Sequence, residues 1–284
     1  MRNNASAQYL ARLLESARYE ILPTPTIADT IRTHLPVGRT VTVTASPRRG
    51  LEDTLALSEV LAADGYHVVP HLAARMISGR AELEEITARM RAGGIDNVFV
   101  PGGDQDPPAG TYTAALDLLD DLKAMGDPFP DVGITGYPDS HPTISDDLTI
   151  QSMWDKRRYA TYIVSNLNFD PRTIEQWVRR LRSRGVGLPM LLGIPGPVDR
   201  TKLLSMATRI GVGDSTRFLA KHKGTLARLA APGGFTGERF LEKCASRLSN
   251  PEFAITGVHV YTFNQIAETE AWRTSYLQSL TESV

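Results

Sequence analysis

Hydrophobic residues along the 284-residue chain fall into two alternating patterns. The first is a short run rich in β-branched residues and bounded by glycine, proline or polar residues, and it predicts a β-strand. Eight such runs occur, at residues 19–23, 40–45, 67–73, 97–102, 132–137, 162–169, 190–196 and 257–263.

The second pattern places apolar residues three and four positions apart and predicts amphipathic helices between the strands. The clearest examples are residues 51–63, 81–92, 114–125 and 171–184. Ser78 precedes the second of these, Gly93-Gly94 ends it, and Asp170-Pro171 is typical of a helix start.

Strict alternation of strand and helix favours parallel strands joined by right-handed crossovers. Eight strands are the number that a closed (β/α)₈ TIM barrel needs, so we predict an α/β fold of that class. A doubly wound open sheet is the alternative. The first strand is not followed by a Gly-x-Gly-x-x-Gly turn, which favours the barrel.

Two segments depart from the regular alternation. Residues 5–17 predict an extra N-terminal helix, placed to plug the bottom of the barrel. Before the last strand, residues 216–230 and 237–248 predict two helices where one would suffice, and we interpret this helical insertion as a lid or rim. No linker-like stretch divides the chain, so residues 1–284 are expected to form a single barrel domain.

Charge and composition narrow the class of partner. The chain has 31 Lys and Arg against 32 Asp and Glu, a balance that argues against binding to nucleic acid or an anionic membrane. No apolar run approaches the roughly 18 residues of a membrane helix, and the start does not resemble a signal peptide. The lone Cys244 excludes an intrachain disulfide. We expect a cytoplasmic protein that binds a small molecule, with a homo-oligomer left open.

Candidate catalytic residues are sought at the carboxyl ends of the strands, where barrels place their chemistry. Glu20 lies within the first strand, where desolvation favours a protonated acid; a structural ion pair is the alternative. Asp104 follows Gly102-Gly103, which let backbone amides approach a ligand; a helix cap is the alternative. His71 and His141, taken singly, are more typical of core residues. The sequence has no metal-ligand spacing, nucleophile elbow or phosphate loop, so no metal site is predicted.

Eight sequence blocks, one near each predicted strand, together resemble the methylenetetrahydrofolate reductase family. The specific blocks are Gly-Tyr-Pro-x-x-His-Pro at residues 136–142 and His-x-Tyr-Thr-x-Asn at residues 259–264. The weaker blocks are Tyr-Glu-Ile-Leu-Pro at 19–23, Val-Thr-Val-Thr-Ala at 41–45, Pro-His-Leu at 70–72, Gly-Gly-Asp at 102–104, Val-Ser-Asn at 164–166 and Leu-Gly-Ile-Pro-Gly at 192–196.

The resemblance implies a barrel that reduces 5,10-methylenetetrahydrofolate to 5-methyltetrahydrofolate with NADH or NADPH, ordinarily through bound FAD. Glu20 matches the general acid that protonates a folate nitrogen, and Asp104 matches the carboxylate that orients the pterin. Asn166 and Gln265 match folate-binding positions. The positions that match the flavin site are Thr44, His71, Tyr137 and His141. Gly103 and Lys156 are further cofactor candidates, and Lys156, Arg157 and Arg158 are expected to face a pyrophosphate.

Departures from the family pattern concern the flavin more than the folate. Gly102 stands where the family usually has arginine, and residues 154–161 replace its basic helix and following turn. These changes favour direct hydride transfer from a reduced nicotinamide, with a deazaflavin as an alternative donor and FAD as a doubtful second cofactor. Two alternatives stay open: another folate one-carbon enzyme, such as one that oxidises methyltetrahydrofolate in a demethylation pathway, and a non-catalytic folate-binding protein. Lys221, Lys223 and Arg228 in the insertion are candidates for contact with a polyglutamate tail or are solvated surface.

Overall fold

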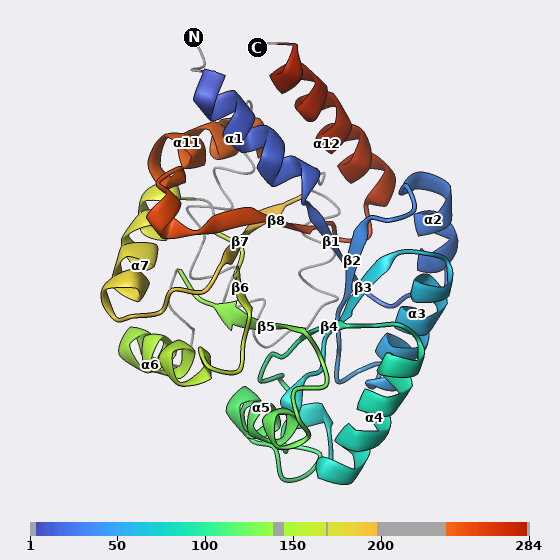
Figure 1. Ribbon diagram of the computed structural model, residues 1–284. Helices are drawn as coiled ribbons and strands as arrows, with labels where there is room; N and C mark the ends of the chain where they lie inside the picture. The colour runs from blue at the N-terminus through green and yellow to red at the C-terminus, as the bar shows by residue number, and fades with distance from the viewer. Residues whose placement is uncertain (1–3, 139–144, 169, 198–236, 283–284) are drawn as a thin grey trace.

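The computed structural model describes residues 4–138, 145–168, 170–197 and 237–282. Eight parallel strands stand in a ring with helices around it (Figure 1), which confirms the predicted (β/α)₈ barrel. The strands are β1 (Arg18–Ile21), β2 (Thr40–Val43), β3 (His67–Pro70), β4 (Asn97–Phe99), β5 (Asp131–Gly136), β6 (Tyr162–Ser165), β7 (Met190–Pro195) and β8 (Ile255–Tyr261).

The strands are hydrogen-bonded in the order β3-β2-β1-β8-β7-β6-β5-β4, so the first and last strands of the chain are neighbours. Arg18, Tyr19 and Glu20 of β1 pair in register with residues 259–261 of β8. Between β3 and β4 the ladder shrinks to one parallel bridge, His71 to Phe99, and a hydrogen bond from the Leu72 amide to the Phe99 carbonyl (2.8 Å). The barrel is therefore nearly closed, with its weakest seam at β3 and β4.

Several strands are shorter than the sequence predicts. The prediction carried β3 to residue 73, β4 to residue 102 and β6 to residue 169, but they end at Pro70, Phe99 and Ser165. Beyond those points the backbones leave the ladder to form the loops of the barrel mouth, and β3 is followed by the 3₁₀-helix η1 (Ala74–Met76). Polar residues that the pattern placed at strand ends therefore lie on loops.

Helices cover the outside of the ring. They are α1 (Asn4–Glu15), α2 (Ile27–His34), α3 (Glu52–Ala63), α4 (Arg80–Ala92), α5 (Ala115–Ala124), α6 (Asp146–Lys156), α7 (Pro171–Ser183), α11 (Gly237–Leu248) and α12 (Ile266–Thr281) among the described residues, with a second 3₁₀-helix η2 (Pro251–Phe253). Asp170 caps α7 as predicted, accepting a hydrogen bond from the Arg172 amide (3.0 Å). The N-cap of α4 is Gly79 rather than Ser78, which instead donates to Glu82.

The interior and the outer layer have separate apolar cores. Inside the ring, Val69, Phe99, Tyr162, Val164 and Leu191 form one cluster, and the larger cluster fills the space between strands and helices. Tyr162 sits at the amino end of β6, where its hydroxyl donates to the side-chain oxygen of Asn97 (2.8 Å) and the Arg18 guanidinium lies 4.3 Å from its ring centre. Tyr162, Asn97 and Arg18 are the first residues of β6, β4 and β1, so they lie at the amino end of the barrel.

The N-terminal helix does not plug that end. Instead α1 lies along α12 and α11 at the barrel wall (Figure 1), and the Ser16 hydroxyl donates to the Thr256 carbonyl of β8 (3.1 Å). The side chains Leu10, Leu13 and Leu14 are buried on its inner face. The apolar face of α1 is buried against neighbouring helices, so α1 buries its hydrophobic side chains without entering the barrel.

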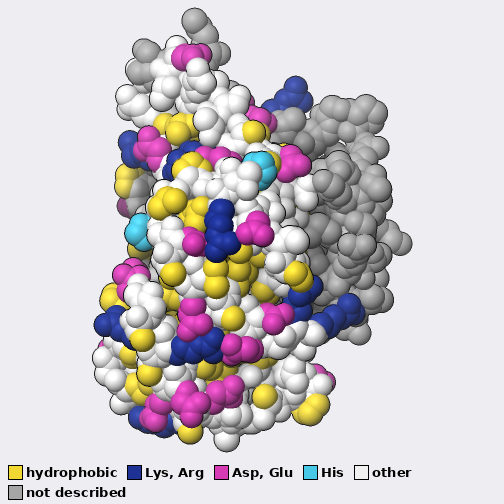
Figure 2. Space-filling model, turned by 90° about the vertical axis from the view of Figure 1, so that its right-hand side faces the viewer, with side chains coloured by type: hydrophobic (Ala, Val, Ile, Leu, Met, Phe, Trp, Pro, Cys, Tyr) yellow, Lys and Arg dark blue, Asp and Glu magenta, His cyan; other side chains and the backbone are white. Residues whose placement is uncertain are grey.

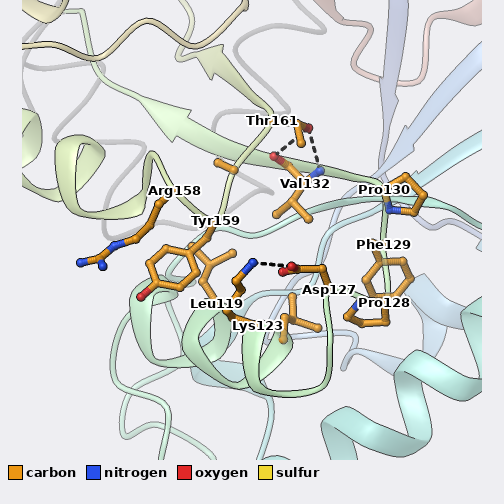
Figure 3. Close-up of a pocket in the computed structure, with 12 residues that line it drawn as sticks. Leu119, Lys123, Asp127, Pro128, Phe129, Pro130, Val132, Arg158, Tyr159 and Thr161 are labelled. Atoms are coloured by element: carbon orange, nitrogen blue, oxygen red, sulfur yellow. Dashed lines mark hydrogen bonds and ion pairs between the residues drawn. The ribbon is translucent and has the colours of Figure 1, made fainter.

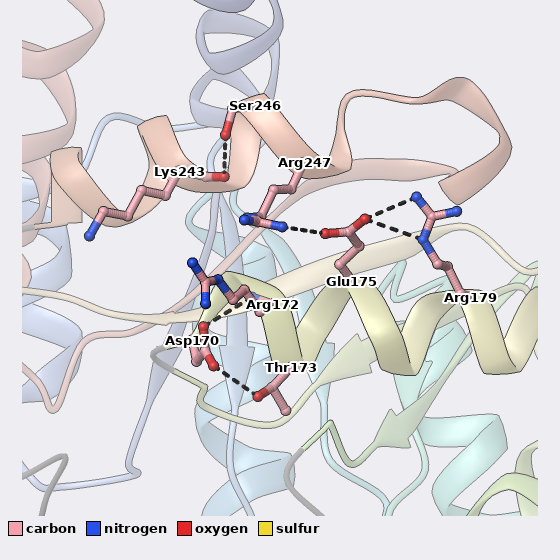
Figure 4. Close-up of polar contacts among 8 residues, drawn as sticks. All are labelled: Asp170, Arg172, Thr173, Glu175, Arg179, Lys243, Ser246 and Arg247. Atoms are coloured by element: carbon pink, nitrogen blue, oxygen red, sulfur yellow. Dashed lines mark hydrogen bonds and ion pairs between the residues drawn. The ribbon is translucent and has the colours of Figure 1, made fainter.

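The second helix of the predicted insertion is present as α11, with the predicted bounds, while residues 216–230 lie outside the described part of the chain. Its buried face, which includes Cys244, packs against α7 and α1. Figure 4 shows Glu175 of α7 between two arginines, accepting from Arg179 (2.9 Å) and from Arg247 of α11 (2.8 Å). The two arginines are exposed, so these ion pairs contribute little stability.

The surface over α2, α3 and α4 carries basic and acidic side chains interspersed (Figure 2). No field of one sign gathers on this face, in keeping with the balanced composition. Within the ranges described above, no helix combines the length and apolarity needed to cross a bilayer.

Candidate active site at the barrel mouth

Glu20 is the centre of a buried acid and imidazole cluster at the carboxyl end of β1. Its Oε2 lies 3.0 Å from Nε2 of His259 and 3.9 Å from Nε2 of His71. The side chains of His259 and His71 are 3% and 10% exposed, and that of Glu20 is 19% exposed. Glu20 is therefore anchored by a histidine while part of its carboxyl group still faces the mouth.

His71 follows the last residue of β3 and packs its ring on Phe99, with 4.7 Å between ring centres. Burial lowers the pKa of His71 to about 4; the Glu20 carboxylate opposes this shift and His259 adds to it. The ring is therefore neutral near pH 7. Its buried Nε2 has no hydrogen-bond partner among the described residues, so it offers a polar atom to a ligand in the mouth.

The low pKa of His71 predicts a pH-dependent stability. The unfolded chain protonates this histidine below its ordinary pKa of 6.5, whereas the folded protein resists protonation down to about 4. Since the unfolded state then binds more protons, stability must fall as the pH decreases through that window. We expect His71 to account for a loss of about 1.5 kcal/mol between about pH 6.5 and pH 5.

Urea unfolding of the wild type and of His71→Asn at both pH values isolates this contribution. The variant should lose less stability on acidification than the wild type by about that amount. Equal losses in the two proteins would show that His71 titrates normally in the folded state.

Two tyrosines connect the surroundings of Glu20 with those of Asp104. Burial raises the pKa of Tyr261 well above its usual range, and Glu20 and then Tyr137 add to the shift. Burial also raises the pKa of Tyr137, a hydrogen bond to Thr135 opposes the shift, and the Asp104 carboxylate adds to it. These electrostatic contacts link Glu20 to Tyr261, Tyr261 to Tyr137, and Tyr137 to Asp104 in turn, near the carboxyl ends of β1, β8, β5 and β4.

Side chains directly after β8 fix the backbone at Glu20 and just beyond it. The buried Thr262 hydroxyl donates to the Glu20 carbonyl (2.6 Å). The Asn264 side chain accepts from the Leu22 amide (2.8 Å) and donates to the Leu22 carbonyl (3.1 Å). Asn264 adopts a positive φ of 59°, which asparagine tolerates better than most residues. His259, Thr262 and Asn264 were not predicted as site residues, although the His-x-Tyr-Thr-x-Asn block contains all three.

Close packing supports Tyr261. Its hydroxyl donates to the Ser165 carbonyl (3.3 Å), and its ring lies edge-on to His259 with 5.0 Å between ring centres. Gly193 of β7 makes this approach feasible, because a Cβ at this position would lie 2.1 Å from the Ser165 oxygen and 2.8 Å from the Tyr261 ring.

Other predicted residues lie around this mouth. Thr44 follows β2, and its buried hydroxyl oxygen has no hydrogen-bond partner in the described part of the protein. Gly103 has a φ of 86° in the loop before Asp104. Asn166 follows β6, is exposed, and donates its amide hydrogen to the Gly136 carbonyl (2.7 Å). Gln265 is the N-cap of α12, directly after the strand end that holds Glu20.

Of the predicted cofactor residues, Lys156 lies away from this cluster. His141 lies outside the described residues. Lys156 lies in the last turn of α6, which leads into the amino end of β6, and its side chain is buried. Desolvation lowers the pKa of Lys156 to about 8, opposed by Asp155.

A hollow of about 260 Å³ opens between α5 and residues 158–161, which join α6 to β6, near the opposite end of the barrel (Figure 3). It is lined by Val132, the second residue of β5, and by Thr161, which precedes β6, so it faces the amino ends of those strands. Lys123 and Asp127 on its rim pair with each other. None of the predicted site residues lines it, so we do not regard it as the active site.

Comparison with known families assigns the chain. The model of the methylenetetrahydrofolate reductase family matches residues 25–272, which is most of the sequence. The protein belongs to this family. Membership indicates a folate-related oxidoreductase that acts on a small-molecule folate with a redox cofactor. The match begins after Glu20, so the placement of that acid rests on the pairing of β1 with β8.

Solved structures with a similar fold share little sequence identity with this protein. They include oxaloacetate acetylhydrolase (13% identity, 86% of this chain and 95% of that chain covered, TM-score 0.48) and 2,3-dimethylmalate lyase of the PEP mutase/isocitrate lyase superfamily (14%, 86% and 96%, 0.46). A putative lyase/mutase from Burkholderia cenocepacia gives 13% identity, 99% and 87% coverage and a TM-score of 0.47. At these values the similarities say nothing about the reaction of this reductase family member.

Proposed function

We propose that this protein reduces 5,10-methylenetetrahydrofolate to 5-methyltetrahydrofolate, with Glu20 as the general acid and Asp104 as the residue that orients the pterin. The observation that supports the proposal is the position of Glu20: a carboxyl group at the carboxyl end of β1, 3.0 Å from a buried histidine and 19% exposed. Family membership supplies the substrate class.

The two carboxyl groups have different environments and therefore different tasks. Hydride adds only to an electrophilic carbon, so a proton must first reach a nitrogen of the five-membered ring and open it to an iminium. In this proposal Glu20, which lies beside the imidazoles of His259 and His71, delivers that proton. Asp104 is exposed, and an ionised carboxylate of this kind can accept two hydrogen bonds from the pterin amino group and ring N–H.

A reduced nicotinamide, NADH or NADPH, supplies the hydride in this proposal. Unpartnered polar atoms of Thr44 and His71 at the mouth fit a ligand with polar groups. Folate positioning falls to Asn166 and Gln265, which follow β6 and β8 at the same end.

Among the residues that the structure describes, the basic side chains expected at a flavin pyrophosphate do not fit FAD. A flavin pyrophosphate needs cations, and Gly102 provides none where the family usually has arginine. Lys156 is buried at the wall, the Arg157 guanidinium stacks 3.7 Å from the Trp154 ring centre, and Arg158 lines the hollow at the amino ends of the strands. We therefore propose direct transfer from the nicotinamide to the folate.

A spectrum and a paired assay test the proposal. The purified protein should lack flavin absorbance, and it should oxidise NADH or NADPH in the presence of methylenetetrahydrofolate at the same rate with and without added FAD. Turnover only with FAD would overturn direct transfer, and no turnover in either case would overturn the reductase. Faster oxidation of methyltetrahydrofolate, or tight folate binding without turnover, would favour the alternative functions.

A further inference from the structure

The loop that carries Asp104 is held by the neighbouring η1 segment rather than by secondary structure of its own. Residues 100–114 connect β4 to α5 and pass beside η1. The amides of Ala74 and Arg75 donate to the carbonyls of Pro101 (3.0 Å) and Gly102 (2.9 Å). Gly103 then turns with a positive φ, and a Cβ there would lie 3.0 Å from the Ala73 Cβ. The approach to Asp104 is thus determined by backbone contacts across the β3–β4 seam.

Arg75 extends these contacts to the rest of the loop. Its guanidinium donates from Nε to the Gln105 carbonyl (2.7 Å), from Nη1 to the Thr113 carbonyl (3.3 Å) and from Nη2 to the Asp106 carboxylate (3.1 Å). Its own carbonyl accepts from the Ala109 amide (2.9 Å). One residue therefore binds the loop directly after Asp104, at its middle and at its end.

The Asp104 carboxylate has no hydrogen bond to another of the described residues, and the residue is exposed. Its position depends on the backbone beneath it, and the Gln105 carbonyl that Arg75 holds is the next group along that backbone. The seam here has only one bridge between β3 and β4, so the strands themselves do little to fix the loop. A planar five-donor fork can hold two carbonyls and a carboxylate at once, whereas a lysine ammonium on a flexible stem cannot do so with the same geometry.

We propose that Arg75 is a positioning residue for the reaction: by clamping the β4–α5 loop it holds Asp104 where that carboxylate meets the pterin. The role of Asp104 in this inference rests on the proposed function, but the clamp itself does not. The family usually has an arginine in this loop, at the position of Gly102. Arg75 brings a guanidinium to the same loop from η1, but its N–H groups bind the loop and not a cofactor.

Hydrogen exchange tests the clamp without reference to activity. In Arg75→Lys, which keeps the charge and the stem, and in Arg75→Ala, amides of residues 102–113 should exchange at least about tenfold faster than in the wild type. Exchange in β1 and β8 should be unchanged. Asp106→Ala removes only the exposed carboxylate and should have a much smaller effect. Unchanged exchange across the loop in both Arg75 variants would overturn the clamp.

Kinetics then test the connection to Asp104. Arg75→Lys should raise the KM for methylenetetrahydrofolate by roughly 10- to 100-fold, since small misplacements of orienting groups have effects of that size, with the nicotinamide KM within about twofold. Free guanidinium should partly restore Arg75→Ala. In an Asp104→Asn background the Arg75 substitution should add less than about twofold, because its effect passes through Asp104.

Three outcomes distinguish a failure of the positioning role from a failure of the proposed function. Fully additive effects, or equal rises in both KM values, would overturn the positioning role while leaving the reductase intact. A faster-exchanging loop in a protein whose wild type shows no folate turnover would confirm the clamp and overturn the proposed function. If Arg75→Ala does not fold, Arg75→Lys carries both measurements.

Discussion

Glu20→Gln is expected to lower kcat for methylenetetrahydrofolate reduction by roughly a hundred- to ten-thousand-fold, the usual contribution of a general acid. Glutamine keeps the size of the side chain and can still hydrogen-bond to His259, which lies 3.0 Å away, but it cannot deliver a proton to the folate nitrogen. The KM for the nicotinamide should change little, since the substitution leaves its contacts in place. Steady-state kinetics with both substrates varied measures this effect.

The matched control is Glu85→Gln, the same substitution at an exposed position in the middle of α4. Glu85→Gln should leave kcat and the melting temperature unchanged, because the side chain is exposed. Glu20→Gln should also melt within a few degrees of the wild type, because glutamine preserves the contact with His259. If Glu20→Gln kept more than about a tenth of the wild-type kcat, general acid catalysis by Glu20 would be excluded.

Gly193→Ala is expected to destabilise the fold by about 3 kcal/mol and to disrupt the mouth. The added Cβ would lie 2.1 Å from the Ser165 carbonyl oxygen, a backbone atom that cannot move without opening the β6–β7 ladder. It would also press on the Tyr261 ring beside Glu20, so activity should fall by more than the unfolded fraction explains. Urea unfolding followed by circular dichroism, with activity measured at low urea, separates the two effects.

Gly187→Ala provides the comparison within the same region of the chain. A Cβ at Gly187 meets nothing within 4 Å, and its φ is not in the left-handed region. This variant should unfold within about 0.5 kcal/mol of the wild type, as surface substitutions usually do. A Gly193→Ala protein as stable and as active as Gly187→Ala would contradict the close packing of Ser165 and Tyr261 described above.

The strand and helix pattern was readable wherever an element buries a regular face. α7 follows the prediction because Asp170-Pro171 starts it and residues such as Ile174, Trp177, Val178 and Leu181 recur on its inner face. α2 was not predicted: it has eight residues, several of them β-branched, and buries only Ile27 and Ile31. The intrinsic helix propensity of such a short segment is weak. It forms a helix because packing against its neighbours stabilises it.

Only part of the candidate site could be predicted from the sequence, because only some of its residues carry a local sequence signal. Glu20 and Asp104 could be selected because each follows a local signal, a polar residue within or after an apolar run. The strand-end residues that hold Glu20 in place, Thr262 and Asn264, carry no such signal. The basic residues near position 156 were expected to face a pyrophosphate, a role that depends on helix orientation and end register rather than on composition.

By itself the sequence determined the eight-strand alternation, the parallel barrel, and the blocks that resemble the reductase family, because side-chain periodicity and turn chemistry act within a few residues. Only the tertiary structure decided which side chains meet. Closure of the ring brings His259 to Glu20 across 239 positions, and the short seam between β3 and β4 sets Arg75 against the loop of Asp104. Contacts of that range depend on strand register and loop course, which local sequence preferences do not specify.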